Sequence, residues 1–305
     1  MFLKMDKKEK FLNLLSNVEP KINFYSKYFH SKFIRAFLVK EKSLVKIFFI
    51  FLKRVFKVDF KKRIKTFWDR DMMVYLADGD ATSLYFFGIL YGDEFNITKF
   101  LIKNLNFNDV FYDIGANYGF YTLLAQEFIK EGEIHSFEPN PKIFKLLKEN
   151  SNLGKFKNTY INELALSDQN GEAEFYDLLD SRRHSGAGSL IKYERFKKYR
   201  VIKVKTIKLD DYVLNHKPPT IMKIDVEGAE PFVLKGGLNL IKNYTPLIIM
   251  EFIPDSLHLE AVKMLFDNKY SAYKLDVNGD LILVNKPKEM LSKNFNSERN
   301  YIFKK

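Results

Sequence analysis

The segment from Val110 to Leu124, VFYDIGANYGFYTLL, constrains the fold more than any other part of the chain. An apolar strand runs into Asp113, a turn carries Gly115 and Gly119, and a helix follows. Glycine lacks a Cβ atom, so the backbone can turn tightly and lie close to a ligand, and the following helix offers unpaired N–H groups. A second strand then ends at Glu138, about 20 residues past the last glycine, where nucleotide-binding βαβ units carry the acid that binds ribose. This order predicts an α/β fold with an adenosine-containing cofactor.

The same segment departs from the pattern of dinucleotide-binding proteins. Asn117 and Tyr118 replace the central glycine of that pattern, and Asp113 stands where an apolar residue is usual, which disfavours a pyrophosphate. An acid at the end of the first strand suits an ammonium group, and the two carboxylate oxygens of Glu138 suit a ribose diol. Together these features predict S-adenosylmethionine. The alternative is an ordinary glycine turn with incidental acids.

Six segments lie in order between Phe107 and Phe252, the first of them within the stretch just described: DIGANYGFYT, FEPNP, ELALSDQNGEAEFY, IKLDDYV, MKIDVEGAEPFVLKGG and IIMEF. In order and spacing they resemble the motifs of the FkbM family of methyltransferases, and KIDVEGAE (Lys223–Glu230) is the most specific. The resemblance implies a class I (Rossmann-like) methyltransferase fold that uses S-adenosylmethionine. It also implies an acceptor hydroxyl, most often on a sugar or a polyketide-like molecule. Because members are diverse, the acceptor does not follow from the family.

Composition bounds these expectations. With 305 residues, 46% of them apolar, the chain can bury one sizeable core plus an appendage. It has no cysteine, which removes disulfides, thiolate metal sites and a cysteine nucleophile. The first ten residues are charged and no small-residue cleavage site follows an apolar stretch, so we expect no secretory signal and a cytoplasmic location.

The first 70 residues carry the charge of the chain. They hold 19 Lys and Arg against 6 Asp and Glu, a net charge of +13 in a chain of net charge +12. We therefore predict a basic, aromatic-rich helical extension over residues 1–70 and a methyltransferase domain over residues 71–305. The apolar run Ser43–Phe56 is broken by Lys46, Lys53 and Arg54 and is too short to cross a membrane. It suits either an amphipathic surface helix or a buried packing helix.

This basic extension indicates possible partners. An anionic membrane surface is one, which would place the protein peripherally at the inner face of the membrane. Nucleic acid is another, but the sequence has no aromatic RNA-binding strand, so we do not expect it.

Strands and helices alternate beyond residue 71, as in a mostly parallel seven-stranded sheet with helices on both faces. We expect strands at 109–114, 133–137, 159–166, 220–224 and 247–251, a small insertion with strands at 172–176 and 201–207, and two last strands after a helix at 256–268. Further helices are expected at 96–105, at 120–130 and from Pro141, with Asn96 and Asn140 as caps.

In such sheets, ligands lie beyond the carboxyl ends of the strands. Several acids occupy these ends, which places them on one rim. The predicted cofactor-binding residues are Asp113, Gly115, Asn117, Gly119, Glu138, Ala165 and Asp168. For Asp168 the alternative is a turn formed with Gly171. The backbone of Ala165 and Leu166 is as good a candidate as Asp168 for contacting the adenine.

Methyl transfer to a hydroxyl requires an in-line approach and removal of a proton. Asp225, at the end of the fourth strand, could orient or deprotonate that hydroxyl, with Glu227 beside it in the turn. Alternatively, Asp225, Glu227 and Glu251 could bind Mg²⁺, which would acidify the hydroxyl. Glu230 is expected to open a helix, where the helix dipole favours an acid.

Histidine and basic residues supply the remaining candidates. His184 lies in a loop rich in Gly and Ser and could be the base or an acceptor ligand, and Arg182 and Arg183 could contact an anionic acceptor. His135 is expected to pack inside a strand. Lys223 is unusual in a buried strand and is expected to reach a carboxylate such as Asp225 or Glu251.

These observations predict an S-adenosylmethionine-dependent O-methyltransferase that modifies a saccharide hydroxyl, with cell-envelope glycan biosynthesis as the expected setting. A lipid, a small amine or RNA is the alternative acceptor. The alternative from another functional class is a protein that binds nucleic acid through the basic extension.

Overall fold

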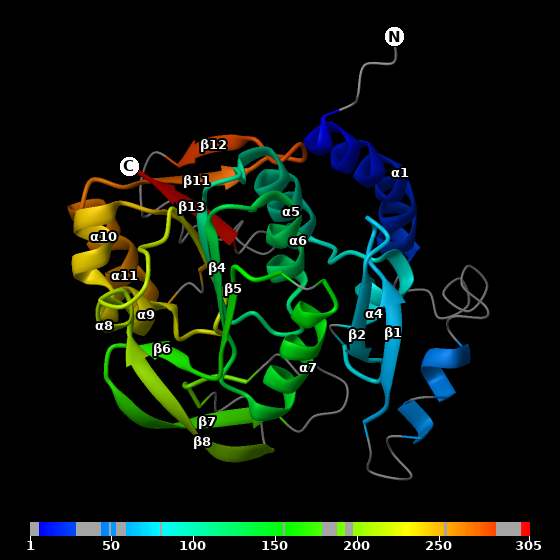
Figure 1. Ribbon diagram of the computed structural model, residues 1–305, viewed down its shortest axis with the longest axis horizontal. Helices are drawn as coiled ribbons and strands as arrows, with labels where there is room; N and C mark the ends of the chain where they lie inside the picture. Colours follow the sequence, from blue (N-terminus) through cyan, green and yellow to red (C-terminus); the bar gives the residue numbers. More distant parts are fainter. Residues whose placement is uncertain are drawn as a thin grey trace.

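A central sheet of eight strands with helices on both faces forms the body of the protein (Figure 1). The computed structural model describes residues 6–28, 44–48, 50–52, 59–79, 81–154, 156–178, 188–192, 198–252, 255–284 and 300–305. The strand order is β12-β11-β13-β10-β9-β3-β4-β5. This arrangement is the class I methyltransferase fold that the sequence predicted.

The sheet has a parallel part and an antiparallel edge. Its parallel strands are β3 (Val110–Ile114), β4 (Glu133–Phe137), β5 (Thr159–Asn162), β9 (Ile221–Ile224) and β10 (Leu247–Glu251), and its antiparallel strands are β11 (Ser271–Leu275), β12 (Leu281–Val284) and β13 (Asn300–Lys304). All five residues of β3 are buried, because helices cover both faces. The sequence predicted seven strands. Three strands rather than two follow residue 268: β12 pairs with β11 at the edge, and β13 lies between β11 and β10.

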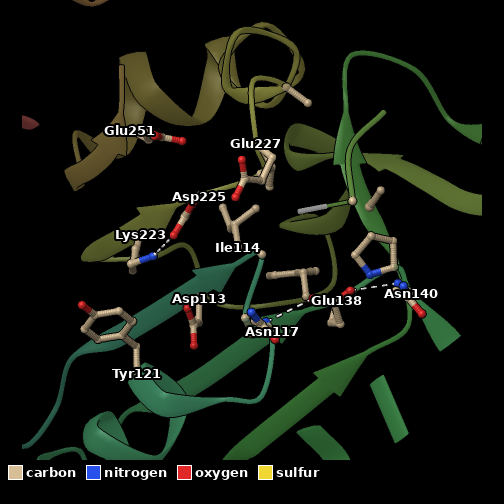
Figure 2. Close-up of a pocket in the computed structure, with 18 of the residues that line it drawn as sticks. Asp113, Ile114, Asn117, Tyr121, Glu138, Asn140, Lys223, Asp225, Glu227 and Glu251 are labelled. Carbon is tan, nitrogen blue, oxygen red and sulfur yellow. Dashed lines mark hydrogen bonds and ion pairs between the residues drawn. The ribbon is translucent and has the colours of Figure 1, made fainter. Parts of the chain in front are cut away.

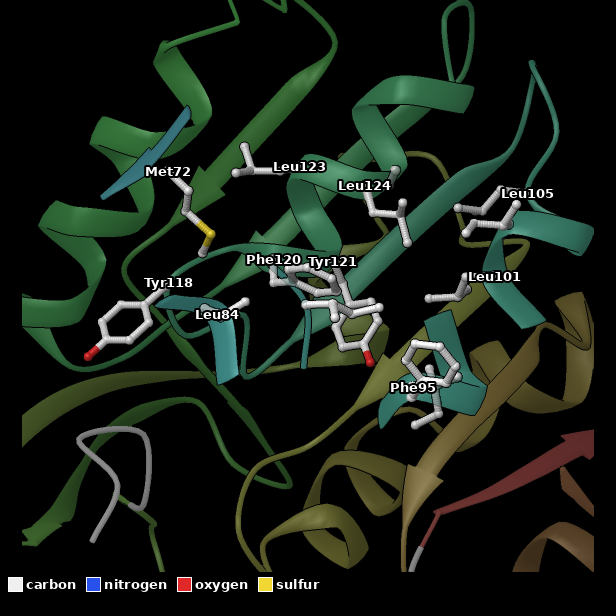
Figure 3. Packing of buried hydrophobic residues seen from close by; sticks show 14 of the residues in the cluster. Met72, Leu84, Phe95, Leu101, Leu105, Tyr118, Phe120, Tyr121, Leu123 and Leu124 are labelled. Carbon is white, nitrogen blue, oxygen red and sulfur yellow. The ribbon is translucent and has the colours of Figure 1, made fainter. Parts of the chain in front are cut away.

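Two hydrophobic clusters fill the space between sheet and helices. Alternate residues of β3 point to opposite faces, so Phe111 belongs to one cluster and Tyr112 to the other. The first cluster contains side chains from α4 (Ala81–Phe87), α5 (Asp93–Asn104) and α6 (Phe120–Phe128), and Figure 3 shows Met72, Leu84, Phe95 and Phe120 within it. The second includes side chains from α8 (Leu209–Tyr212), α9 (Glu230–Gly236), α10 (Leu238–Tyr244) and α11 (Ser256–Asp267).

The helix caps test two local predictions. Helix α7 (Pro141–Asn152) begins at Pro141, and the Asn140 side chain accepts a hydrogen bond from the Lys142 backbone N–H at 3.0 Å, as predicted. The prediction for Asn96 is wrong. Helix α5 begins three residues earlier, at Asp93, with Gly92 at the cap position, because Asp93 and Glu94 form a favourable acidic first turn.

A second sheet, of three strands, projects beside the carboxyl ends of the central strands. It consists of β6 (Ala165–Ser167), β8 (Tyr199–Lys208) and β7 (Gly171–Leu178), in that order. The predicted single strand at 159–166 is therefore wrong. Its first part pairs with β4 in the central sheet, and its last part pairs with β8 in the small one, with Glu163 and Leu164 between them.

Described parts of the first 70 residues pack against the rest of the protein. Helix α1 (Lys7–Tyr28) buries Phe11, Leu15 and Ile22 in the first hydrophobic cluster. Strand β1 (Lys61–Lys65) pairs with β2 (Asp71–Tyr75), so the predicted boundary after residue 70 falls between two paired strands. Residues 44–48 and 50–52 are helical. Among the described helices, none has the length and apolar character that crossing a membrane requires.

Candidate active site

One cavity, of about 280 Å³, lies at the carboxyl ends of β3, β4, β9 and β10 (Figure 2). Its volume is near the lower end of the usual range for ligand pockets, about 300–1,000 Å³. Its charged lining consists of Glu94, Asp113, Glu138, Lys223, Asp225, Glu227 and Glu251. The structure thus gathers on one rim the acids that the sequence placed at strand ends, with the exception of Asp168.

The glycine turn after β3 is shaped by its protein neighbours. Gly115 has a φ of +82°, and a Cβ atom there would lie 1.9 Å from the carbonyl oxygen of Asp225. Gly119 has a φ of +89°, caps α6 and lies outside the cavity lining, and a Cβ atom there would meet Leu147 at 2.6 Å. Close backbone packing against the residue after β9 therefore requires glycine at position 115, whereas the left-handed φ favours it at position 119. Asn117, between them, lines the cavity with a φ of +49°.

Glu138 is held at the end of β4 by two backbone groups. Its Oε2 accepts from the Asn117 N–H at 3.1 Å and its Oε1 from the Asn140 N–H at 2.9 Å (Figure 2). Burial raises the pKa of Glu138 to about 7, although these two N–H groups oppose the shift. A carboxylate has about four acceptor positions, so both oxygens can still accept from a ligand diol.

Lys223 is a buried cation on the opposite wall. Its Nζ lies 2.7 Å from Asp225 Oδ2 and 4.8 Å from the centre of the Tyr121 ring. Burial opposes the charge, but Asp225, Glu94 and Asp113 together raise the pKa of Lys223 above its usual range. The prediction that Lys223 reaches Asp225 is confirmed.

Asp113 lies next to Lys223, because these residues are register partners on β3 and β9. Its side chain is 1% exposed and accepts a hydrogen bond from the Thr122 hydroxyl at 2.6 Å. Burial raises its pKa.

Glu94 was not predicted from the sequence. It belongs to the first turn of α5 and accepts a hydrogen bond from the Tyr121 hydroxyl of α6. Burial raises the pKa of Glu94, and the neighbouring Lys223 opposes this shift. Locally, the sequence marks this acid only as a favourable helix start. Its place in the cavity depends on how α5 packs against α6.

A second acidic cluster lies at the ends of β9 and β10. Carboxylate oxygens of Asp225, Glu230 and Glu251 all lie within 4.8 Å of one another. The predicted magnesium set contained Glu227 in place of Glu230. Glu227 has a φ of +55° in the turn before α9, and Glu230 opens that helix as predicted.

Glu230 has protein partners within this cluster. Its Oε1 accepts from the Val226 N–H at 2.8 Å, and its Oε2 lies 3.0 Å from His258 Nε2. His258 is fully buried, and its Nδ1 lies 2.9 Å from Asp255. Burial works against the charged form of His258, but the flanking Glu230 and Asp255 raise its pKa overall. The buried histidine therefore fixes Glu230, and magnesium stays a prediction.

The other predicted residues are placed as follows. Ala165 lines the cavity, whereas the Asp168 carboxylate lies 3.2 Å from Lys235 Nζ and is not among the lining residues. His135 is packed inside β4 and hydrogen-bonds Tyr212, as expected. Arg182, Arg183 and His184 lie outside the described residues.

The cavity lining shows which cofactor it suits. The lining contains six carboxylate side chains and one ammonium group. Such a lining disfavours the pyrophosphate of a dinucleotide and suits a cofactor with a sulfonium and an ammonium group. Glu138 presents two oriented oxygens where a ribose diol would bind. The residues present therefore fit S-adenosylmethionine.

Fold and cavity together define a class I methyltransferase. Residues 113–272 match the model of the methyltransferase FkbM domain, which is more than half of the chain. The protein belongs to this family and is a methyltransferase that uses S-adenosylmethionine.

Two characterised relatives are similar over 194 residues each, at 27% identity. One is the hexuronic acid methyltransferase AglP of Haloferax volcanii, where the match covers 61% of this chain and 74% of the relative. The other is the 2-O-methyltransferase NoeI of Sinorhizobium fredii, where it covers 58% and 79%.

Among solved structures, a methyltransferase FkbM from Methylobacillus flagellatus is 13% identical with a TM-score of 0.40. The match covers 75% of this chain but only 48% of that chain. Fibrillarin from Aeropyrum pernix, solved with bound S-adenosylmethionine, is 12% identical with a TM-score of 0.38, and its match covers 68% of this chain and 74% of that one.

Proposed function

We propose that this protein transfers the methyl group of S-adenosylmethionine to a hydroxyl group of a saccharide. The observation that carries the proposal is a cavity in which Glu138 and a cluster of acids around Lys223 face each other. The names of the two relatives support a sugar acceptor, one through hexuronic acid and the other through 2-O-methylation. Cell-envelope glycan biosynthesis is the setting that we propose.

The cofactor would be held along the turn after β3. Glu138 would accept hydrogen bonds from the ribose hydroxyls, and Asp113 would lie near the ammonium group. Backbone at Ala165 and Leu166 lines the cavity and would frame the adenine. When bound, the cofactor supplies an electrophilic methyl group on a positively charged sulfur.

The acceptor hydroxyl would lie between Glu94 and Asp225. Asp225 is fixed by its ion pair with Lys223, which suits it to orient the hydroxyl. Glu94 has a raised pKa and is positioned by the Tyr121 hydroxyl, which suits it to take the proton. We therefore propose Glu94 as the general base, in place of the Asp225, Glu227 or His184 that the sequence favoured for this step.

The lining also bears on the type of sugar. Six carboxylates around the reacting region repel an anionic acceptor, so we expect a neutral hexoside to be a better acceptor than a hexuronide. Contacts from Arg182 and Arg183 to the acceptor would instead favour the hexuronide, because their positive charges attract its carboxylate.

An acceptor panel tests the proposal. The purified full-length protein and radiolabelled S-adenosylmethionine are incubated with p-nitrophenyl glycosides of neutral hexoses, a p-nitrophenyl glucuronide, ethanolamine, a phospholipid and total RNA. Incorporation into a glycoside, followed by mass spectrometry, supports the proposal. Incorporation into RNA, lipid or amine alone would replace it.

Metal dependence is tested in the same assay. If Mg²⁺ binds at Asp225 and Glu251, EDTA abolishes methyl transfer and added Mg²⁺ restores it. If Glu94 and Asp225 act without metal, EDTA leaves the rate unchanged.

A further inference from the structure

Four apolar side chains of the helical residues 44–48 and 50–52 are exposed to solvent, while Val45, Ile50 and Leu52 are half-buried. Leu44 is 67% exposed, Ile47 62%, Phe48 56% and Phe51 57%. The one lysine among these residues is directed inward. Lys46 Nζ donates to the carbonyl oxygen of Asp78 at 3.3 Å and to the hydroxyl of Thr82.

An inward-directed lysine beside four exposed apolar side chains is unusual for a surface helix. In water, apolar side chains usually face the core and lysines extend into solvent. Helix α1 follows the ordinary rule, because it buries Phe11, Leu15 and Ile22. At residues 44–52 burial instead lowers the pKa of Lys46 to about 8, which nearby Asp78 only partly offsets. An apolar environment on the outer side of the helix would match this arrangement.

We propose that the exposed face formed by Leu44, Ile47, Phe48 and Phe51 docks on the surface of an anionic lipid membrane. Surface binding of this kind combines apolar side chains inserted at the headgroup boundary with basic residues beside them. Between residues 44 and 65 the sequence has eight Lys and Arg and one acid, Asp59. Strand β1 carries part of this charge on its exposed residues, and Lys62 is one of them, whereas Arg63 and Lys65 are paired with Asp71. The positive charge favours anionic headgroups over a neutral surface.

The docking face is joined to the active-site cavity by direct contacts. Asp78, which accepts from Lys46, also accepts from the Tyr118 hydroxyl, and Tyr118 lines the cavity. Thr82, the other partner of Lys46, is in α4 together with Leu84, which lines the cavity too. Docking would therefore hold the cavity close to the membrane. If the proposed function is correct, the acceptor class is a saccharide carried on a membrane lipid.

Vesicle sedimentation of the full-length protein tests the docking. The vesicles contain phosphatidylcholine alone or phosphatidylcholine with phosphatidylglycerol, at low and high salt. The test variant is Leu44→Ser/Ile47→Ser/Phe51→Ser. The control variant is Leu214→Ser/Val277→Ser, since these residues are 77% and 70% exposed elsewhere on the molecule. Circular dichroism and calorimetry with S-adenosylmethionine verify that both variants are folded.

We expect the wild-type protein and the control variant to bind anionic vesicles, and the triple variant to bind them roughly tenfold or more weakly. Three results would overturn the proposal: no wild-type binding at low salt, equal losses in both variants, or binding that depends on salt but not on the three apolar residues. A dimer that the triple variant dissociates, without vesicle binding, would assign the face to a second copy of the chain. None of these readouts requires methyl transfer, so they remain informative if the acceptor panel fails.

Discussion

The two walls of the cavity are built in different ways. The wall that carries Glu138 comes from two short segments, residues 113–118 and 137–140, and backbone N–H groups of Asn117 and Asn140 fix the carboxylate. The facing wall brings together Glu94, Tyr121, Lys223 and Asp225 from separate elements, and side-chain contacts hold it. We infer that substitutions in the first wall change cofactor affinity, whereas those in the second change the chemical step and the stability of the fold.

The largest effect is expected for Glu94→Gln. Loss of the proposed base should lower turnover by about 10²–10⁴-fold while the affinity for S-adenosylmethionine changes little. The measurements are methyl transfer to the best acceptor of the panel and calorimetry with the cofactor. Glu172→Gln is the matched control, because Glu172 lies on β7, outside the cavity lining. A larger loss in His184→Ala would make that histidine the base, and weaker cofactor binding in Glu94→Gln would assign Glu94 to the cofactor wall.

Asp225→Asn should reduce turnover by about 10²-fold, because the amide keeps the shape of the side chain but loses the ion pair that orients the hydroxyl. The variant also leaves the buried Lys223 without its closest partner. Breaking a buried pair costs about 3–5 kcal/mol, and we expect the low end, since Glu94 and Asp113 remain near the ammonium. Denaturant unfolding and the transfer assay measure the two effects. Near-normal turnover would contradict a role for Asp225 at the acceptor.

In the first wall, Glu138→Ala should weaken binding of S-adenosylmethionine by about 1–3 kcal/mol, the range for hydrogen bonds to a charged group. At saturating cofactor, turnover should be close to that of the wild type. Calorimetry decides this, with NAD as the comparison ligand. Unchanged affinity, or tighter binding of NAD, would remove Glu138 from the cofactor site.

The smallest effect concerns pH. Burial raises the pKa of Glu138 to about 7, and only the ionised carboxylate accepts from both ribose hydroxyls. Affinity for S-adenosylmethionine should therefore fall by about tenfold per pH unit below 7 in the wild type and stay flatter in Glu138→Gln.

The raised pKa of Glu138 also affects the stability of the ligand-free protein, and here lower pH is favourable rather than unfavourable. Because the folded protein holds the Glu138 proton more tightly than the unfolded chain, this contribution is present at low pH and is lost as pH rises through about 7. Unfolding of the ligand-free protein between pH 5 and 8, compared with Glu138→Gln, measures this contribution.

The difference between the walls also explains what the sequence could predict. Strand β4 and the start of α7 at Pro141 agree with their predictions because apolar runs, glycine turns and caps are local signals. Glu94 has no such signal, because its role depends on contacts with α6 and β9 across the fold. The split of the predicted strand at 159–166 into β5 and β6 has a similar cause. A run of eight residues that could form one strand does not reveal that the chain changes sheet within it.

Glu227 and Glu230 show the same limit at the scale of three residues. Both follow Asp225 closely in the sequence, yet the left-handed turn at Glu227 leaves Glu230 to approach Asp225 and Glu251. Spacing alone cannot distinguish the two acids, because the turn geometry decides which of them joins the cluster.

The predominance of carboxylates in the cavity has a consequence for product inhibition. Methyl transfer turns a positively charged sulfonium into a neutral thioether, so the spent cofactor carries one positive charge fewer than the fresh one. A lining with six carboxylates and one ammonium group attracts the fresh cofactor more strongly than the spent one. We therefore expect the fresh cofactor to bind more tightly than S-adenosylhomocysteine, and calorimetry with the two ligands measures the difference.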